Sequence, residues 1–408
     1  MASTSDGKVS GLAWKVGAAT FSRLVLNTTR RFVYPFAPVL SRGLGVPLTA
    51  ITSIIAATQA TSLLGLFSGP LADRLGYKVM MLLGLGLLTI GLFAGGFLPF
   101  YGVVLVALLL AGLGKSIFDP AIQAYVGQRV PFQRRGLVIG VLEFSWAGSS
   151  LVGIPLVGFL IHYFGWRAAF FALGIAGLLS FVAVALSISG DGRSPDRRQP
   201  AGYLKAWQTL GKQRSALGAV VFAFLVSAAN DNLFVVYGAW LEQSFSLSVI
   251  ALGVGTGVIG VAELCGESIT AAFSDRLGLK RAVMIGTTLC VISYGALPLM
   301  RQSLPLSLGG LFFVFLSFEF TFVSALSLGT ELLPEYRATM MSTFLAAAGI
   351  GRMFGALIGG SIWLSGGILL TALVSAAISA MGLIALIWGL RGWEHKKHNS
   401  SATKTPSL

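Results

Sequence analysis

Apolar segments of about 20 residues recur along the whole chain, and the short stretches between them hold most of the charged residues. A helix of about 20 apolar residues is long enough to cross the hydrocarbon core of a bilayer. The pattern predicts twelve such helices, at residues 16–40, 48–72, 77–97, 102–126, 137–161, 168–189, 215–240, 248–273, 280–300, 304–330, 339–363 and 367–390. We therefore expect an all-α polytopic membrane protein with twelve transmembrane helices.

The composition supports a membrane protein and explains the positive charge. Of the 408 residues, 55% are hydrophobic and 11% are charged, whereas a soluble domain has about 25% charged residues. The formal net charge is +14, but 21 of the 29 Lys and Arg fall in the termini, in the even-numbered loops or at the helix ends beside these loops, and only three fall in the odd-numbered loops. This positive-inside distribution predicts a multi-pass protein of a prokaryotic cytoplasmic (inner) membrane. Both termini are expected to be cytoplasmic, and nucleic acid is not expected as a partner.

The two halves of the chain repeat each other. Asp73-Arg-Leu-Gly76 recurs as Asp275-Arg-Leu-Gly278, an offset of 202, and Pro131-x-x-Arg134 recurs as Pro334-x-x-Arg337, an offset of 203. The repeat predicts two pseudo-symmetric six-helix bundles, with a substrate site between them. The expected boundaries are 1–15 for the N-terminus, 16–189 and 215–390 for the bundles, 190–214 for the linker and 391–408 for the tail.

The loop after the second predicted helix carries a recognisable motif. Gly69-Pro-Leu-Ala-Asp-Arg-Leu-Gly-Tyr-Lys78 resembles the G-x-L-A-D-R-x-G-x-K loop of the major facilitator superfamily, and residues 271–280 are a degraded second copy. The resemblance covers about residues 15–391 and implies a rocking-bundle transporter. It implies that Asp73 faces the positive end of helix eleven near Arg337 and locks the gate. The implied gate residues are Gly69, Asp73, Arg74, Gly76, Lys78, Arg134, Asp275, Arg276 and Arg337.

Two features bear on the direction of transport. Gly148, Gly153, Pro155 and Gly158 in predicted helix five resemble the glycine-proline motif of drug:proton antiporters of that family, which favours export. Leu108, however, occupies the position at which those antiporters usually carry an arginine. The leading hypothesis is proton-coupled export of a small amphipathic or anionic molecule by alternating access. The alternative is a proton-coupled symporter that imports an organic anion or a sugar-like solute.

Ionisable residues inside predicted helices are candidates for function. Arg23, Asn27, Arg30 and Tyr34 are spaced by 4, 3 and 4 residues and share one helical face, with Arg31 at its border. Asn27 and Tyr34 map onto Asn230 and Tyr237 at an offset of 203, and the family resemblance implies that helices one, four, seven and ten line the cavity. The candidate substrate-binding residues are Asn27, Arg30, Arg31, Tyr34, Asp119, Asn230, Asp231, Tyr237 and Glu319.

We expect Arg30 or Arg31 to pair with Asp231, and Lys115 to pair with Asp119 four residues away on the same face. Two interpretations stay open. The pairs can simply hold the halves together, or a substrate or proton can compete for one partner, with Arg30 favoured over Arg31 as the substrate ligand.

The candidate proton-coupling residues are Glu143, Asp231, Glu263 and Glu267. The resemblance places helices five and eight together, so Glu143, Glu263 and Glu267 are expected to form an acidic cluster. Carboxylates that are crowded in a low-dielectric site bind protons more readily than isolated ones in water. Phe118, Phe144, Trp146 and Phe320 are candidate aromatic lining residues.

The chain lacks the motifs G-x-S-x-G, H-E-x-x-H and G-x-x-x-x-G-K-[ST], which would indicate a hydrolase, a zinc protease or an ATP site. Its three His and two Cys are not at metal-ligand spacing. We therefore expect no enzyme activity, no cofactor and no metal. The expected partners are a small-molecule substrate, H+ as the coupling ion and the lipid bilayer, and the expected state is a monomer.

Overall fold

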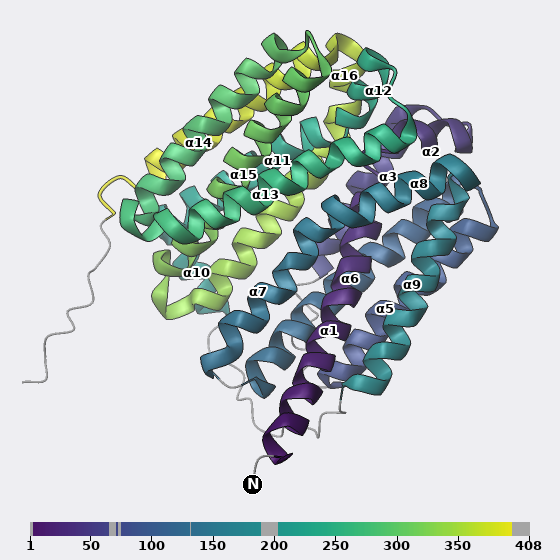
Figure 1. Cartoon of the computed structure of the whole chain (residues 1–408). Coiled ribbons are helices and arrows are strands. Elements are labelled where there is room, and N and C mark those ends of the chain that lie inside the picture. The colour runs from purple at the N-terminus through teal and green to yellow at the C-terminus, as the bar shows by residue number, and fades with distance from the viewer. Residues whose placement is uncertain (1–2, 65–70, 72–74, 131, 189–202, 394–408) are drawn as a thin grey trace, which may run out of the picture.

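The computed structural model describes residues 3–64, 71, 75–130, 132–188 and 203–393, and all regular elements in these ranges are helices (Figure 1). They are α1 (Ser3–Arg31), α2 (Ala37–Leu44), α3 (Leu48–Ala60), η1 (Thr61–Leu64), α5 (Tyr77–Phe97), α6 (Tyr101–Arg129), α7 (Phe132–Gly148), η2 (Ser149–Gly153), α8 (Ile154–Phe164), α9 (Arg167–Ser187), α10 (Tyr203–Lys212), α11 (Arg214–Phe234), α12 (Tyr237–Phe245), α13 (Val249–Leu277), α14 (Leu279–Ala296), η3 (Leu297–Met300), α15 (Leu304–Leu332), η4 (Pro334–Tyr336) and α16 (Arg337–Gly389). The all-α expectation is confirmed.

Within the described ranges, nine helices are long and apolar enough to cross a membrane, or ten if the bent pair Ala37–Leu44 and Leu48–Leu64 counts as one span. One of the nine, Thr339–Gly389, has 51 residues. Its backbone is not helical at Gly366 and Gly367, so it consists of two segments, each long enough for one crossing at about 1.5 Å per residue. The chain is a multi-pass membrane protein, and the count of twelve spans stays a prediction.

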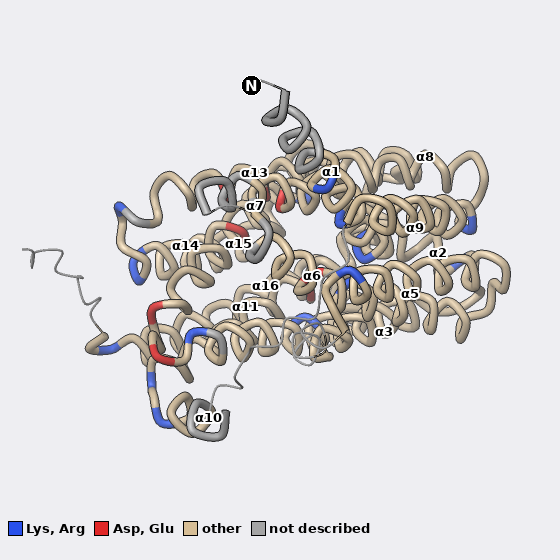
Figure 2. Tube along the Cα trace, turned by 90° about the horizontal axis from the view of Figure 1, so that it is seen from below, with Lys and Arg blue, Asp and Glu red and all other residues tan. Residues whose placement is uncertain are grey.

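The helices form two groups that lie side by side in Figures 1 and 2. The N-half contains α1 to α9, and the C-half contains α11 to α16. We call the side where α1 begins and α10 lies the linker face, and the side that carries α2 and α12 the opposite face (Figure 1).

The first helix of each half is interrupted at the same point of the repeat. The chain leaves helical structure after Arg31 in the N-half and after Phe234 in the C-half. In the N-half, Pro35 lacks the backbone N–H that a continuing helix needs. A Cβ atom added to Gly238 would lie 2.3 Å from the carbonyl oxygen of Pro35, so the two breaks touch each other and only glycine fits there.

Further contacts between the halves also lie on the opposite face. A Cβ atom at Gly360 would lie 2.7 Å from Oγ1 of Thr52, and one at Gly158 would lie 3.1 Å from the carbonyl oxygen of Val249. The exposed Arg42 contacts Glu242 at 2.6 Å. The halves are therefore closed against each other on this face.

The glycine-proline segment contributes to the same interface. Ser149–Gly153 forms a widened π-helical turn directly before α8, and Pro155 follows, which cannot donate a helical hydrogen bond. A Cβ atom at Gly153 would lie 2.1 Å from Oγ1 of Thr28 on α1, and Gly158 contacts α13. The π-helical turn thus packs against both α1 and α13, and α8 packs against α13.

Candidate functional site

A cavity of about 410 Å³ lies between the two halves. Seven helices from both halves line it: α1, α3, α7, α11, α13, α15 and α16. The lining residues are Arg30, Arg31, Tyr34, Gln59, Glu143, Trp146, Asn230, Asp231, Phe234, Glu263, Glu267, Phe315, Phe318, Glu319, Phe322, Val323, Leu326 and Arg352. Helix α6 corresponds to the fourth predicted helix, which was expected to line the cavity, but it contributes none of these residues.

The cavity extends from the helix breaks toward the linker face. Near the breaks the Arg31 and Glu263 side chains are 2% and 4% exposed. The Glu143 side chain, which is closer to the linker face, is 43% exposed. Since exposure increases in this direction, the cavity is accessible from the linker face.

Arg31 and Glu263 form a buried ion pair between the halves. Nη2 of Arg31 contacts Oε1 of Glu263 at 2.7 Å, and Nη1 contacts Oε2 at 3.0 Å. The guanidinium lies 4.4 Å from the ring centre of Trp146, and the Ser150 hydroxyl donates to Glu263 at 3.5 Å. A bidentate, charge-assisted geometry of this kind is among the stronger polar contacts in proteins.

The expected pairing of Arg30 or Arg31 with Asp231 is wrong. Consecutive helical residues point about 100° apart, so the two arginines leave α1 in different directions. Arg31 points toward α13 and binds Glu263. Asp231 instead accepts a hydrogen bond from the Tyr34 hydroxyl at 2.9 Å.

Arg30 is linked to Asp231 through two neutral side chains. Nη2 of Arg30 donates to Oε1 of Gln59, and Nε2 of Gln59 donates to the Tyr34 hydroxyl, which in turn donates to Asp231. The chain of hydrogen bonds crosses from the N-half to the C-half. Gln59 was not among the sequence candidates, because it lies in the second predicted helix, which was not expected to line the cavity.

A second charged cluster lies within the N-half. Nε of Arg23 contacts Oδ1 of Asp119 at 3.2 Å, and Nη1 of Arg23 contacts Oε1 of Glu143 at 2.9 Å. Lys115 also pairs with Asp119, as the spacing of four predicted. Glu143 lines the same cavity as Glu263 and Glu267, and Arg23 holds it there.

Two carboxylates of the cavity lack a cationic partner. A Cβ atom at Gly266 would lie 2.8 Å from Cβ of Glu319, so α13 and α15 are in close contact and bring Glu267 beside Glu319. In the described part of the chain, no Lys, Arg or His lies within ion-pair distance of either carboxylate. Together with Glu263 they form the acidic wall of the cavity; Figure 2 shows acidic segments near α7, α13 and α15.

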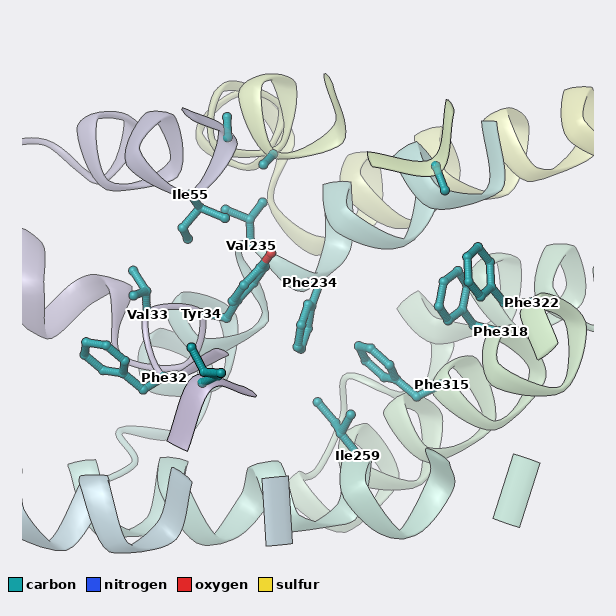
Figure 3. Packing of buried hydrophobic residues seen from close by; sticks show 14 of the residues in the cluster. Phe32, Val33, Tyr34, Ile55, Phe234, Val235, Ile259, Phe315, Phe318 and Phe322 are labelled. Carbon is teal, nitrogen blue, oxygen red and sulfur yellow. The ribbon is translucent and has the colours of Figure 1, made fainter. Parts of the chain in front are cut away.

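Phenylalanines form an apolar wall (Figure 3). Phe234 stacks on Tyr34 with ring centres 4.2 Å apart and contacts Phe315 at 5.1 Å. Phe318 stacks on Phe322 at 5.6 Å. The spacing of 3 and 4 between positions 315, 318 and 322 is the helical-face signal that could have identified this wall.

Several predicted residues lie outside the cavity lining. Asn27 donates to Ser145 at 3.1 Å, and Tyr237 is bonded to Thr256 at 2.8 Å. Asp119 is occupied by Arg23 and Lys115. Of the aromatic candidates only Trp146 lines the cavity; Phe118 and Phe320 are buried, and Phe144 is exposed.

The predicted gate residues are placed only in part. Gly69, Asp73 and Arg74 lie outside the described residues, as do the side chains of Arg134 and Asp275. Gly76 and Gly278 have φ values of 91° and 80°, which favour glycine at both copies of the turn. Arg276 is exposed, and Arg337 lies 3.6 Å from Glu331.

The lysines of the two motif copies make equivalent contacts. Lys78 donates to the carbonyl oxygen of Ala185 at 2.7 Å, and Lys280 donates to that of Leu390 at 2.8 Å. Each lysine therefore caps the C-terminal end of the last helix of its own half, where a cation is favoured. For metals, the described residues contain no group of three or more His, Cys, Asp or Glu that could hold an ion.

Comparisons with known proteins agree with this architecture. The chain is 25% identical over 333 residues to the multi-drug resistance efflux pump PmrA homolog of Lactococcus lactis, covering 79% of this chain and 78% of the relative. It is 26% identical over 363 residues to the gallate transporter of Pseudomonas putida, covering 80% of each.

A solved structure has the same fold. It is the inward-facing, occupied form of a bacterial homologue of the human lysosomal transporter Spinster, with a TM-score of 0.74 and 14% identity, covering 93% of this chain and 97% of that one. The sequence pattern of the Major Facilitator Superfamily matches residues 19–230 and 219–407. Two helical halves, a cavity between them and a match over nearly the whole chain lead to one conclusion: this protein is a transporter of the Major Facilitator Superfamily.

Proposed function

We propose that this transporter carries a small amphipathic molecule and couples its movement to protons. The observation that carries the proposal is the cavity between the halves, where a phenylalanine wall on α15 lies beside the carboxylates Glu267 and Glu319. The apolar wall suits a hydrophobic body and the charged wall suits a polar group. The carboxyl groups can bind and release protons.

Orientation follows from the distribution of charge. We assign the linker face to the cytoplasm, because α1 begins and α10 lies on this face and the positive-inside rule predicts that the basic termini and linker are cytoplasmic. Both termini are then cytoplasmic, in a prokaryotic inner membrane, and the structure is an inward-facing state. Two bundles, residues 16–189 and 215–390, rock about the cavity, and the protein acts as a monomer.

The buried ion pair gives a route for coupling. Arg31 and Glu263 hold the halves together on the closed side, so the transition to the outward-facing state must break this pair. A proton on Glu263 removes the charge that holds Arg31. Glu267 lies one turn away on the same helix and can pass the proton to or from the open cavity. We assign Glu263 and Glu267 to coupling, and the residues of the motif loops, including Asp73 and Asp275, to gating.

Two directions of transport have specific support. Export by antiport is favoured by the glycine-proline segment at α8 and by the relative named as a multidrug efflux pump homologue. Symport of an organic anion is the second candidate. It is favoured by Arg30 and Arg352, which line the cavity without an acidic ion-pair partner among the described residues, and by the gallate transporter relative.

The test is transport in proteoliposomes with an imposed pH gradient of either sign. The panel contains aromatic carboxylates, neutral ring compounds and amphipathic cations. We expect at least one class to be moved against its own gradient, and a protonophore to abolish this movement. Protein-free liposomes are the control. Transport that proceeds equally with and without a pH gradient for every transported solute would overturn proton coupling.

A further inference from the structure

Two arginines from opposite halves face the cavity without a carboxylate to neutralise them. Arg30 on α1 donates to the amide oxygen of Gln59, and Arg352 on α16 lies 5.4 Å from the ring centre of Phe322. In the described part of the chain neither contacts an acidic side chain within ion-pair distance.

The packing of α16 against α11 fixes the position of Arg352. Cβ atoms at Gly351 and Gly355 would lie 2.1 and 2.2 Å from the carbonyl oxygens of Phe224 and Ala228. The two backbones are therefore in direct contact on both sides of Arg352. This places Arg352 beside the turn of α11 that carries Asp231, and the charges of Arg30 and Arg352 both act on Asp231.

The charges of Arg30, Arg352 and Asp231 do not balance. Arg31 is neutralised by Glu263, while Arg23 and Lys115 are neutralised by Asp119 and Glu143. What remains in this part of the cavity is the Asp231 carboxylate and the two guanidinium groups that act on it. A guanidinium cannot lose its proton in a protein, so this site carries an excess of one positive charge, which a monoanion would balance.

The side chains around Arg30 and Arg352 indicate which group the bound anion carries. Phe322 lies under Arg352, and Phe318, Phe315 and Phe234 continue the apolar wall from there to Tyr34. The volume of about 410 Å³ is within the range of small-molecule sites. A flat ring attached to an anionic group fits this combination.

We propose that the cavity binds a ring-bearing monocarboxylate, with the carboxylate held between Arg30 and Arg352 and the ring against the phenylalanines of α15. This rests on the proposed function and names its substrate class. Because each half supplies one arginine, the bound anion links the two halves. Arginine suits this role because its planar fork can bind a carboxylate through two parallel hydrogen bonds.

The charge balance also sets the sign of coupling. Glu267 and Glu319 share the cavity with Glu263, Glu143, Arg31 and Arg352. With both of these carboxylates ionised, the groups outside the ion pairs sum to one negative charge; with both protonated, they sum to one positive charge. Protons and the anion therefore bind together, which selects symport over antiport.

The test is isothermal titration of the purified full-length protein with benzoate, benzylamine, benzamide and acetate. We expect benzoate to bind at least about tenfold more tightly than the other three, since only benzoate carries both the ring and the anion. Arg30→Gln and Arg352→Gln should each weaken benzoate binding about 10–100-fold. Arg301→Gln removes an exposed charge outside the cavity and should leave binding unchanged.

Lysine variants provide the test if a glutamine variant fails to fold. If a glutamine variant elutes as an aggregate, Arg30→Lys and Arg352→Lys keep the charge and should give intermediate affinity. Benzoate should also bind more tightly at about pH 6 than at about pH 8. This pH dependence of the affinity should be smaller in a Glu267→Gln, Glu319→Gln double variant. The proposal would be overturned if benzylamine bound more tightly than benzoate. It would also be overturned if Arg30→Gln and Arg352→Gln both left the affinity for benzoate unchanged.

The binding test and the transport test can fail separately. Proton-driven transport of other solutes without benzoate binding would reject the anion site and leave the proposed function standing. Benzoate binding that depends on both arginines, without any effect of the pH gradient on transport, would reject proton coupling and leave the anion site standing.

Discussion

Arg31 and Glu263, 232 positions apart in the chain, form a bidentate ion pair between the two halves, with nitrogen–oxygen distances of 2.7 and 3.0 Å. Neither side chain is more than 4% exposed. Removing one partner of such a pair leaves a buried charge without compensation, which typically costs about 3–5 kcal/mol. Removing both partners leaves no stranded charge.

Arg31→Gln and Glu263→Gln should therefore each destabilise the inward-facing state by about 3–5 kcal/mol, and the double variant by clearly less than their sum. The measurement is a double-mutant cycle from the thermal unfolding of the purified transporter. Arg42 and Glu242 provide the matched control, because they also join the halves but Arg42 is 62% exposed. The double-mutant cycle on Arg42 and Glu242 should give a coupling free energy of less than about 1 kcal/mol. Additive effects of Arg31→Gln and Glu263→Gln would show that the pair contributes nothing.

Gly238→Ala should open the opposite face. The added Cβ atom would meet the carbonyl oxygen of Pro35 at 2.3 Å, and because this oxygen belongs to the backbone, the halves must separate. Overpacking of this kind costs about 1–3 kcal/mol. Gly257→Ala is the control, since its Cβ atom would meet nothing within 4 Å.

The measurement is the distance between spin labels attached at Arg42→Cys and Glu242→Cys, in a background that lacks Cys265 and Cys290. The distribution should shift to longer distances in the Gly238 variant and stay unchanged in the Gly257 variant. An unchanged distribution in both would mean that the two helix breaks do not hold this face closed.

The sequence predicts the helices well because the bilayer leaves little choice. A chain in hydrocarbon must satisfy its backbone hydrogen bonds internally, so long apolar segments become helices. The pairing of Lys115 with Asp119 was predictable for the same local reason, since a spacing of four puts both side chains on one face of a helix. The repeat offset of 203 also placed Tyr34 opposite Tyr237; Tyr34 lies within the first helix break, and Tyr237 directly follows the second.

The contacts between the halves could not be predicted in this way. Arg31 reaches Glu263 on α13 because the two halves are closed against each other near the helix breaks in this state, and no local pattern encodes the relative position of two rigid bundles. Asp231, the symmetric choice, is bonded to Tyr34 instead. The break at Val235 contains no proline, so no local signal marks it, and the apolar pattern predicted one continuous helix over residues 215–240.

Tyr34→Phe should impair transport, whereas Tyr237→Phe should not. The Tyr34 hydroxyl connects Gln59 to Asp231 in the cavity, while the equivalent Tyr237 hydroxyl is bonded to Thr256 outside it. Each change leaves the stacked ring in place and removes one hydroxyl, with a similar cost of about 1–3 kcal/mol in stability. Initial transport rates in proteoliposomes should fall about tenfold for Tyr34→Phe only. Equal losses in both variants would mean that the hydroxyl of Tyr34 acts only on stability.

Glu267→Gln should separate transport from the pH gradient. Glu267 has no cationic partner among the described residues and lies one helical turn from Glu263, so its carboxyl can exchange protons with the open cavity. Glutamine keeps the size of the side chain but cannot carry a proton. We expect exchange of labelled for unlabelled substrate across the membrane to persist, while accumulation driven by the pH gradient falls at least about tenfold.

Glu331→Gln is the control, because this partly exposed residue near the linker face lies outside the cavity. Undiminished proton-driven accumulation in Glu267→Gln would exclude this carboxyl from coupling. The same measurement on Glu319→Gln would then decide whether the second unpaired carboxylate carries the proton.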